Sequence, residues 1–248
     1  ALAPKAESEL IIALAPAMND FLGQLFDIES EVDRLTEQHD ALAPLSLMKR
    51  KFVQRKAMTR YKADEAAGFD GPQLEAELAA RIGGSFSELA FARHLQTWLA
   101  DDAAHADDLA LAERYAAWSA HTAAGRERHR AGVMFKAPAR IDPLQLVPLV
   151  TDSSTGYSVH TLHHIRRNRQ DHAFALTDAG AGLEYALDQA NYCIWCHEQG
   201  KDSCSKGLKE KDGRFRKSPF GVTLAGCPLE ERISEFHKLK AEAVPVGA

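Results

Sequence analysis

The clustering of its cysteines constrains this chain more than any other feature. All four cysteines lie between Cys193 and Cys227 of a 248-residue sequence. A disulfide framework would more naturally be spread through a chain of this size. Four thiols close together in sequence instead favour one metal site, and thiols stay available for a metal in a reducing compartment. The sequence therefore predicts a single metal centre in a cytoplasmic protein.

The spacing of the cysteines favours a 4Fe-4S cluster over zinc. Cys193 and Cys196 stand across a tight turn, so both thiolates can reach one centre. Cys204 follows across a polar loop, and Cys227 comes after twenty-two further residues. Structural zinc usually takes its ligands from two paired knuckles, whereas Cys227 stands alone. The predicted cluster ligands are therefore Cys193, Cys196, Cys204 and Cys227, and zinc on the same four residues is the alternative.

Three other interpretations of the cysteines stay open. The string Cys193-Ile-Trp-Cys196-His197 matches the attachment site of a c-type haem. Two additional cysteines lie nearby, however, and the first nine residues do not resemble a signal peptide. A thioredoxin-like pair would need a strand-helix-strand context, whereas a helical pattern precedes this pair. The last alternative is that the cysteines are structural and bind no metal.

Cys227 is expected at the N-terminus of a helix. Pro228 suits a first helical turn, and apolar residues from Leu229 to Leu239 recur at helical spacing. The free N–H groups and the positive dipole end at that position would favour an anionic cluster. Lysines and arginines outnumber acids between Lys201 and Lys217, and this positive charge would raise the reduction potential of the cluster.

The first 131 residues are predicted to form a helical bundle that serves as a scaffold or an interaction surface. Apolar residues recur at steps of three and four from Phe21 to Leu35, which predicts one face of a helix that begins near Ala17. A second helix is expected from about Leu45, beside a basic run at 49–56.

Further helices and an unremarkable surface complete the predicted bundle. Ser85 and Glu88 have the spacing of a capping box that opens a helix, and Tyr115 and Trp118 fall on another. The scattered histidines share no spacing that would converge on a metal, so most of them are expected at the surface: His39, His94, His105, His121 and His129.

Two more segments follow the bundle, and the predicted class is all-α. Residues 132–176 are rich in proline and turn signals and are interpreted as a linker with one or two short strands. Residues 177–248 are interpreted as a small four-cysteine domain. Its first helix would be capped by Thr177 or Asp178 and would lead into Cys193.

Composition excludes several classes of function. The net charge of −5 gives no general reason to expect a nucleic-acid partner, and the apolar runs fall far short of the roughly 20 residues that span a bilayer. The sequence contains no G-x-G-x-x-G fingerprint and therefore no sign of a Rossmann domain for flavin or nicotinamide. No Ser-His-Asp or paired-carboxylate arrangement stands out. We expect a chain that is not catalytic alone and that forms the N-terminal part of a larger protein.

The cysteine motifs resemble those of a known family. Gln189-Ala-Asn-Tyr-Cys193-Ile-Trp-Cys196 and Gly226-Cys227-Pro-Leu-Glu-Glu resemble the helical ferredoxin domain that precedes the flavin domains of the glutamate synthase small subunit and dihydropyrimidine dehydrogenase. The likeness covers about residues 178–241. The family usually has a shorter step before its Cys-Pro pair and carries two sets of cysteines, whereas this chain has one.

The resemblance implies a small helical ferredoxin-like domain whose 4Fe-4S cluster passes electrons in an NAD(P)H oxidoreductase. FAD and NAD(P)H would then lie on other domains or on a partner subunit. A flavin-containing partner is expected to dock at two basic stretches, Lys206–Lys217 and His163–Arg169. The alternative function is a zinc-stabilised helical interaction domain without redox activity.

Overall fold

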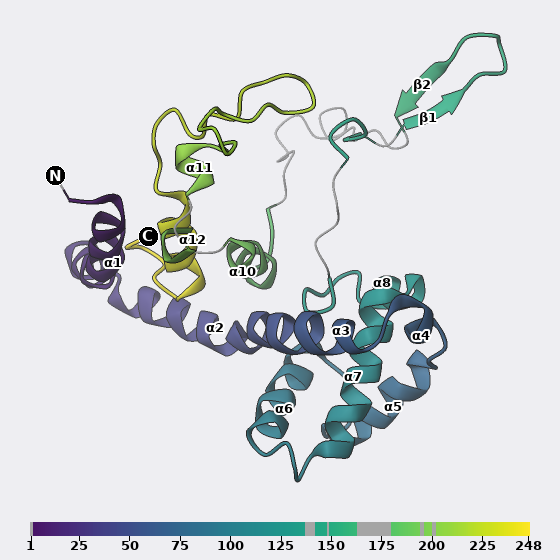
Figure 1. Ribbon diagram of the computed structural model, residues 1–248. Coiled ribbons are helices and arrows are strands. Elements are labelled where there is room, and N and C mark those ends of the chain that lie inside the picture. Colours follow the sequence, from purple (N-terminus) through teal and green to yellow (C-terminus); the bar gives the residue numbers. More distant parts are fainter. Residues whose placement is uncertain (1, 137–141, 148, 163–179, 194–195, 200–201) are drawn as a thin grey trace, which may run out of the picture. The chain divides into compact units, whose positions relative to one another are not determined.

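Helices account for most of the chain that the computed structural model describes, which comprises residues 2–136, 142–147, 149–162, 180–193, 196–199 and 202–248 (Figure 1). The predicted helical character is thus confirmed. A two-stranded antiparallel sheet is also present, so a purely all-α class is wrong. Among the described residues, no helix has both the length and the apolar character needed to cross a membrane.

The elements, in chain order, are α1 (Pro4–Phe26), α2 (Glu29–Met48), η1 (Lys49–Ala57), α3 (Met58–Arg60), α4 (Ala63–Ala67), α5 (Gly71–Arg81), α6 (Glu88–Ala100), α7 (Ala106–His121), α8 (Ala123–Arg128), β1 (Leu149–Asp152), β2 (Val159–Leu162), α10 (Leu183–Tyr192), η2 (Cys196–Gln199), α11 (Ser203–Lys206) and α12 (Ile233–Ala241).

The chain divides into two compact units. The first comprises Ala1–Ala137, Leu183–Gly207 and Gly226–Ala248, and the second comprises Pro138–Gly182 and Leu208–Ala225. All four cysteines belong to the first unit. The boundaries predicted at residues 131 and 177 stay predictions about independent domains, because membership of one compact unit does not test independent folding.

The second unit contains the sheet. β1 and β2 pair antiparallel in a register that sets Leu149 opposite Leu162, and both strands are exposed along their whole length. The apolar pair Leu149 and Val150, which lacks helical phase, thus lies in a strand. The basic stretch His163–Arg169 falls outside the described residues, as do the predicted helix caps Thr177 and Asp178.

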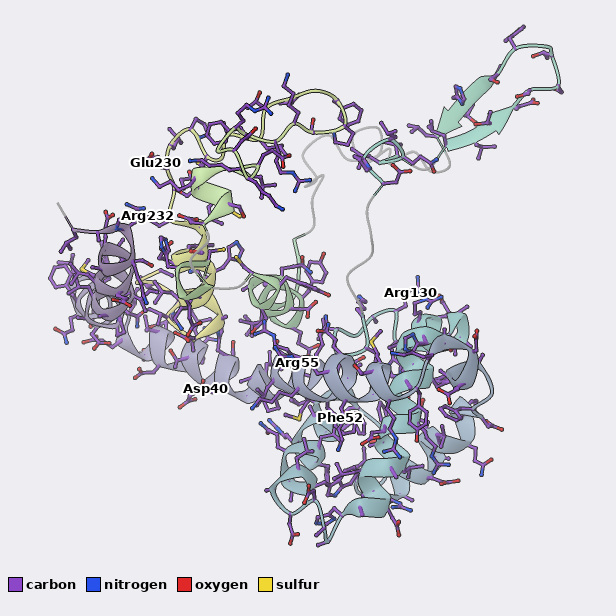
Figure 2. The ribbon with its side chains drawn as sticks, viewed as in Figure 1. Asp40, Phe52, Arg55, Arg130, Glu230 and Arg232 are labelled. Atoms are coloured by element: carbon purple, nitrogen blue, oxygen red, sulfur yellow. The ribbon has the colours of Figure 1, made fainter. Side chains whose placement is uncertain are left out.

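The main core lies around one long helix and the helices after it. α2 continues through η1, a π-helix, into α3, and Figure 1 shows the three as one rod beside α6 and α7. Phe52 of η1 is fully buried, whereas Arg55, three residues later, is exposed (Figure 2). The core residues of the other helices include Leu78, Phe91, Leu95, Leu111 and Tyr115.

The helix predicted to run from Ala17 past Leu35 is interrupted. α1 ends at Phe26, because Asp27 adopts a left-handed conformation with φ 54°, and α2 begins at Glu29. The prediction of one continuous apolar face is therefore wrong. Phe21 is 54% exposed, whereas Val32, beyond the break, is buried.

The predicted capping box at Ser85 is also wrong, by two residues. Ser87 caps α6, since its Oγ accepts the N–H of Ala90 at 3.1 Å. Glu88 does not reach back to a cap. Its carboxylate instead accepts the backbone N–H groups of Val133 and Met134, at 2.8 and 2.9 Å, and ties the segment after α8 to the start of α6.

Two of the five histidines are exceptions to the predicted surface position. His39 is buried on α2, and His129 is buried beside Tyr115, whose hydroxyl lies 2.9 Å from its Nε2. Its Nδ1 lies 3.2 Å from Glu88. Helical periodicity does not reveal such burial, because these contacts come from elements distant in sequence.

Candidate metal centre

α10 positions the first predicted ligand. Leu187 and Ala190 are buried and give the helix an inward face, as their helical spacing requires. Tyr192 is the last helical residue, and Cys193 follows it directly. Cys196 then opens η2, one turn farther along the chain.

A buried ion pair fastens α10 to the long helix. Lys49, the first residue of η1, places its Nζ 2.6 Å from the Oδ1 of Asp188 and 2.9 Å from the hydroxyl of Tyr192. The side chains of Lys49 and Asp188 are only 6% and 5% exposed. Arg50 adds a hydrogen bond to the carbonyl oxygen of Asn191 at 2.5 Å. The helix that leads into Cys193 is thus held by contacts that helical periodicity did not predict.

Cys204 and Cys227 are brought together by their backbones. Cys204 lies on the short helix α11, and its carbonyl oxygen accepts the N–H of Cys227 at 2.9 Å. Gly226 makes this approach possible: its φ is 92°, and a Cβ at that position would lie 2.4 Å from the carbonyl oxygen of Ser205. Only glycine combines that dihedral angle with that proximity.

The segment between Cys204 and Cys227 forms a loop whose two ends lie close together. Leu208 donates its N–H to the carbonyl oxygen of Leu224 at 3.0 Å, so the segment returns close to the point where it leaves. Two isolated antiparallel bridges lie within it, Lys209 with Phe215 and Lys217 with Thr223. The twenty-two intervening residues therefore do not separate the two cysteines in space.

The predicted helix start at Cys227 and Pro228 is wrong. Glu230 has a left-handed φ of 52°, which interrupts the pattern, and α12 begins at Ile233. Leu229, assigned to the apolar stripe, is 78% exposed. Glu230 and Arg232 precede α12 (Figure 2). The dipole of α12 therefore gives no argument for an anionic cluster at Cys227.

Polar side chains surround Cys196. Burial raises the pKa of this thiol, and the neighbouring Cys204 and Asp202 raise it further. His197 directs its Nε2 toward two carboxylates, at 3.0 Å from Glu235 and 3.4 Å from Asp202. A protonated thiol at Cys196 would have to release its proton to bind a metal.

Glu235 links this region to α1. Its Oε1 accepts the hydroxyl of Ser8 at 2.5 Å, and both residues are buried. Burial raises the pKa of Glu235, but hydrogen bonds, the one from Ser8 foremost, outweigh that effect and hold the pKa below its ordinary value. Arg232 adds an ion pair to Glu7 of α1 at 2.7 Å. The start of α12 is therefore fixed against α1.

The structure gathers the cysteines without closing a ligand shell. Cys204 is joined to Cys227 by a backbone hydrogen bond, and its thiol raises the pKa of the Cys196 thiol. Cys193 precedes Cys196 by three residues in the sequence. None of the four is in a disulfide. In the part of the chain that is described, no three Cys, His, Asp or Glu side chains converge closely enough to hold a metal ion. A bound metal would have to draw the thiols inward.

The polar residues beside the cysteines are not predicted by the sequence. His197 belongs to a recognisable pattern only as part of the haem attachment string, and Asp202 and Glu235 belong to no motif. The one available signal was Asp202 before Ser203, the spacing of a helix N-cap, and Asp202 does accept the N–H of Ser205 at 3.4 Å. The approach of Glu235 to His197 depends on tertiary structure alone.

Comparisons with known proteins show similarity to RP005 and not to the family that the cysteine motifs suggested. A family model described as the RP005 N-terminal alpha-helical domain matches residues 1–27, which contain α1. An uncharacterized protein, RP005 of Rickettsia prowazekii (strain Madrid E), is 27% identical over 256 residues, covering 97% of this chain and 83% of that protein. No solved structure matches the chain.

These matches overturn the resemblance to the helical ferredoxin domain. The similarity to RP005 covers nearly the whole chain, including the segment at 178–241 on which the resemblance rested, and neither match names a ferredoxin or an oxidoreductase. Among the described residues no ferredoxin-like cluster domain is seen either, since no group of side chains there converges to hold a metal. Short cysteine motifs do not identify a family, because any protein that binds a metal through four thiols needs similar spacings.

Proposed function

We propose that Cys193, Cys196, Cys204 and Cys227 bind one 4Fe-4S cluster and that the chain passes electrons to a flavin-containing domain or subunit. The observation that carries the proposal is the hydrogen bond from the N–H of Cys227 to the carbonyl oxygen of Cys204. It brings together two residues that are far apart in sequence, and the thiol of Cys204 is near enough to Cys196 to raise the pKa of that thiol.

Two features support a cluster over a mononuclear ion. The ligands come as one pair and two single cysteines, whereas structural zinc usually uses two paired knuckles. Cys204 is exposed, and a centre that exchanges electrons with a partner needs such an accessible edge. When bound, the cluster would supply one-electron transfer. The chain's own residues would then hold the cluster and present it to the partner.

A flavin or another redox centre would have to mediate between the cluster and NAD(P)H, because a one-electron centre cannot exchange hydride directly, and a flavin is the proposed partner. FAD and NAD(P)H would bind elsewhere in the assembly. The basic stretch Lys206–Lys217 is the proposed docking site for the flavin-containing partner, and the exposure of most of its lysines and arginines supports this role. A reducing compartment such as the cytoplasm would keep the four thiols available.

Anaerobic purification of the full chain tests the proposal. We expect a brown protein that absorbs at about 400 nm and contains about four iron atoms and four sulfide ions per chain. Cys227→Ser should lower the iron content strongly. Ser203→Ala, beside Cys204 in α11, is the matched control and should retain it. Full iron content in the Cys227→Ser variant would remove that residue from the site.

A zinc-stabilised interaction domain is the second candidate. The carboxylates of Asp202 and Glu235 lie close to Cys196 and do not discriminate between the two candidates, because zinc and a 4Fe-4S cluster are both anionic centres when four thiolates bind them. The cysteines lie on or beside α10 and α11, which pack against α12, and α12 is fastened to α1, so a structural ion at the cysteines would hold these helices together. A colourless protein with one zinc per chain would establish this candidate and exclude the cluster.

A further inference from the structure

α1 carries two different faces. Its inner face is built of small buried residues: Ser8, Ala15 and Asn19 lie toward α12 and the C-terminal segment, and Gly23 lies toward the start of α2. It is tightly fitted: Asn19 Oδ1 accepts the N–H groups of Val246 and Gly247, at 3.0 and 3.2 Å. This inner face accounts for the position of α1 in the first unit.

The large apolar residues of α1 point the other way. Leu14, Met18, Phe21 and Leu25 are 52%, 46%, 54% and 59% exposed. Together with the partly buried Ile11 they follow one another at steps of three, four, three and four. We call these five residues the outer seam. A helix that places its small residues inward and its large ones outward needs a second partner to cover the latter.

The spacing of the outer seam identifies the kind of partner. Steps of three and four are the heptad pattern that packs knobs into holes of another helix. The seam itself carries no charge, because Glu9 and Asp20 lie on the polar strip of the helix. Glu7 is in phase with the seam one step before Ile11, but it is ion-paired with Arg232 of the same chain. Lys5 is the one basic residue of α1, and an acidic helix does not suit an anionic membrane.

We propose that the outer seam binds the outer seam of a second copy of this chain in an antiparallel helix pair. The seam is nearly symmetric about Met18. A two-fold axis there sets Ile11 level with Leu25 of the other copy and Leu14 within one residue of the level of Phe21, so large side chains lie near one another across the axis. A two-fold arrangement uses the same surface twice and needs no other protein.

The available area suits a dimer. Leu14, Met18, Phe21, Leu25 and the adjoining Leu10, which is 46% exposed, each leave about half of their surface uncovered. At about 200 Å² for a large apolar side chain, they offer roughly 500 Å² per copy. Two copies would therefore bury about 1,000 Å² or more, the lower bound for a specific interface.

Sedimentation equilibrium of the full chain at about 50 μM tests the proposal, because this concentration populates complexes of micromolar affinity. We expect a species of twice the chain mass of 27.2 kDa. Phe21→Glu and Leu14→Glu should each give a monomer with unchanged helical circular dichroism. Ala13→Glu, on the exposed polar strip of α1, adds the same charge outside the seam and should remain dimeric.

Three results would overturn the proposal. The first is a monomeric wild-type chain at that concentration. The second is a dimer that survives both seam substitutions, since the dimer contact would then lie elsewhere. The third is a monomer that binds vesicles of anionic phospholipid and loses this binding in the Phe21→Glu variant, which would assign the seam to a membrane surface. Sedimentation measures the mass of the complex and not its metal content, so a failure of this proposal can be told apart from a failure of the proposed metal centre.

Discussion

At the scale of single residues, the firmest attachment of the cysteine region is a pair of buried charges. Lys49 and Asp188 lie 2.6 Å apart at the contact between η1 and α10, and Lys49 also stands 4.6 Å from the ring centre of Tyr192. Removing one partner of a buried pair leaves the other charge without compensation. Such a loss is more damaging than the pair itself is stabilising.

We expect Asp188→Asn to lower the free energy of unfolding by about 3–5 kcal/mol, measured by urea denaturation. The double variant Lys49→Met/Asp188→Leu removes both charges and should recover most of that loss. Glu127→Gln breaks an exposed pair with Arg130 and should have no measurable effect. An Asp188→Asn variant as stable as Glu127→Gln would show that α10 is held in another way.

Glu88 makes the stability of the main core dependent on pH. Burial raises the pKa of its carboxyl group, but the hydrogen bonds from His129 and from the N–H groups of Met134 and Val133 outweigh burial and set the pKa below its ordinary value. The stabilisation is therefore present above the ordinary pKa and is lost as the pH falls through the lowered value in the folded state.

The urea midpoint should consequently decrease as the pH falls below about 4.5. Glu88→Gln keeps an oxygen that can accept the two N–H groups but cannot ionise, so its midpoint should be lower at neutral pH and should change less in acid. A pH dependence identical to that of the wild type would assign the acid sensitivity to other carboxylates, of which Glu75 is the first candidate because its pKa is also lowered.

At the scale of elements, Gly226 decides whether the two late cysteines meet. Gly226→Ala combines a left-handed φ with a Cβ placed 2.4 Å from a backbone oxygen. Gly221 has a similar φ of 79° but nothing within 4 Å of its Cβ position. Gly221→Ala is therefore a matched control that carries the dihedral strain without the steric conflict.

We expect Gly226→Ala to destabilise the chain by about 1–3 kcal/mol more than Gly221→Ala does, in urea denaturation. If the four cysteines bind a cluster, Gly226→Ala should also reduce the iron content, since it separates Cys227 from Cys204. Equal effects of the two substitutions would mean that the close approach at Gly226 is not required.

At the scale of the whole molecule, the proposed function predicts a redox-active chain that turns over nothing by itself. Dithionite should bleach its visible absorbance, whereas NADPH alone should not, because the sequence carries no dinucleotide fingerprint. Adding the flavin-bearing partner should restore reduction by NADPH, and raised salt should slow it if basic residues such as Lys209 and Lys217 form the docking surface. Rapid bleaching by NADPH in the isolated chain would exclude this account.

Sequence patterns predicted the character of the chain better than its boundaries. Helical periodicity located α7 with Tyr115 and Trp118, and it located the buried residues Leu187 and Ala190 of α10. It ran through the break at Asp27, because a single left-handed residue does not disturb the spacing of apolar side chains. It likewise missed the break at Glu230, and with it the true start of α12.

The sequence by itself determined that the chain is mostly helical and that its four cysteines are clustered between Cys193 and Cys227, because both properties depend on local spacing. Tertiary structure alone decided that Cys204 lies against Cys227, that Lys49 is buried beside Asp188, and that the large side chains of α1 face outward. The physical reason is that each of these outcomes depends on contacts between segments distant in sequence. Spacing within one segment says which side chains share a face, but the partner that covers the face is chosen by packing.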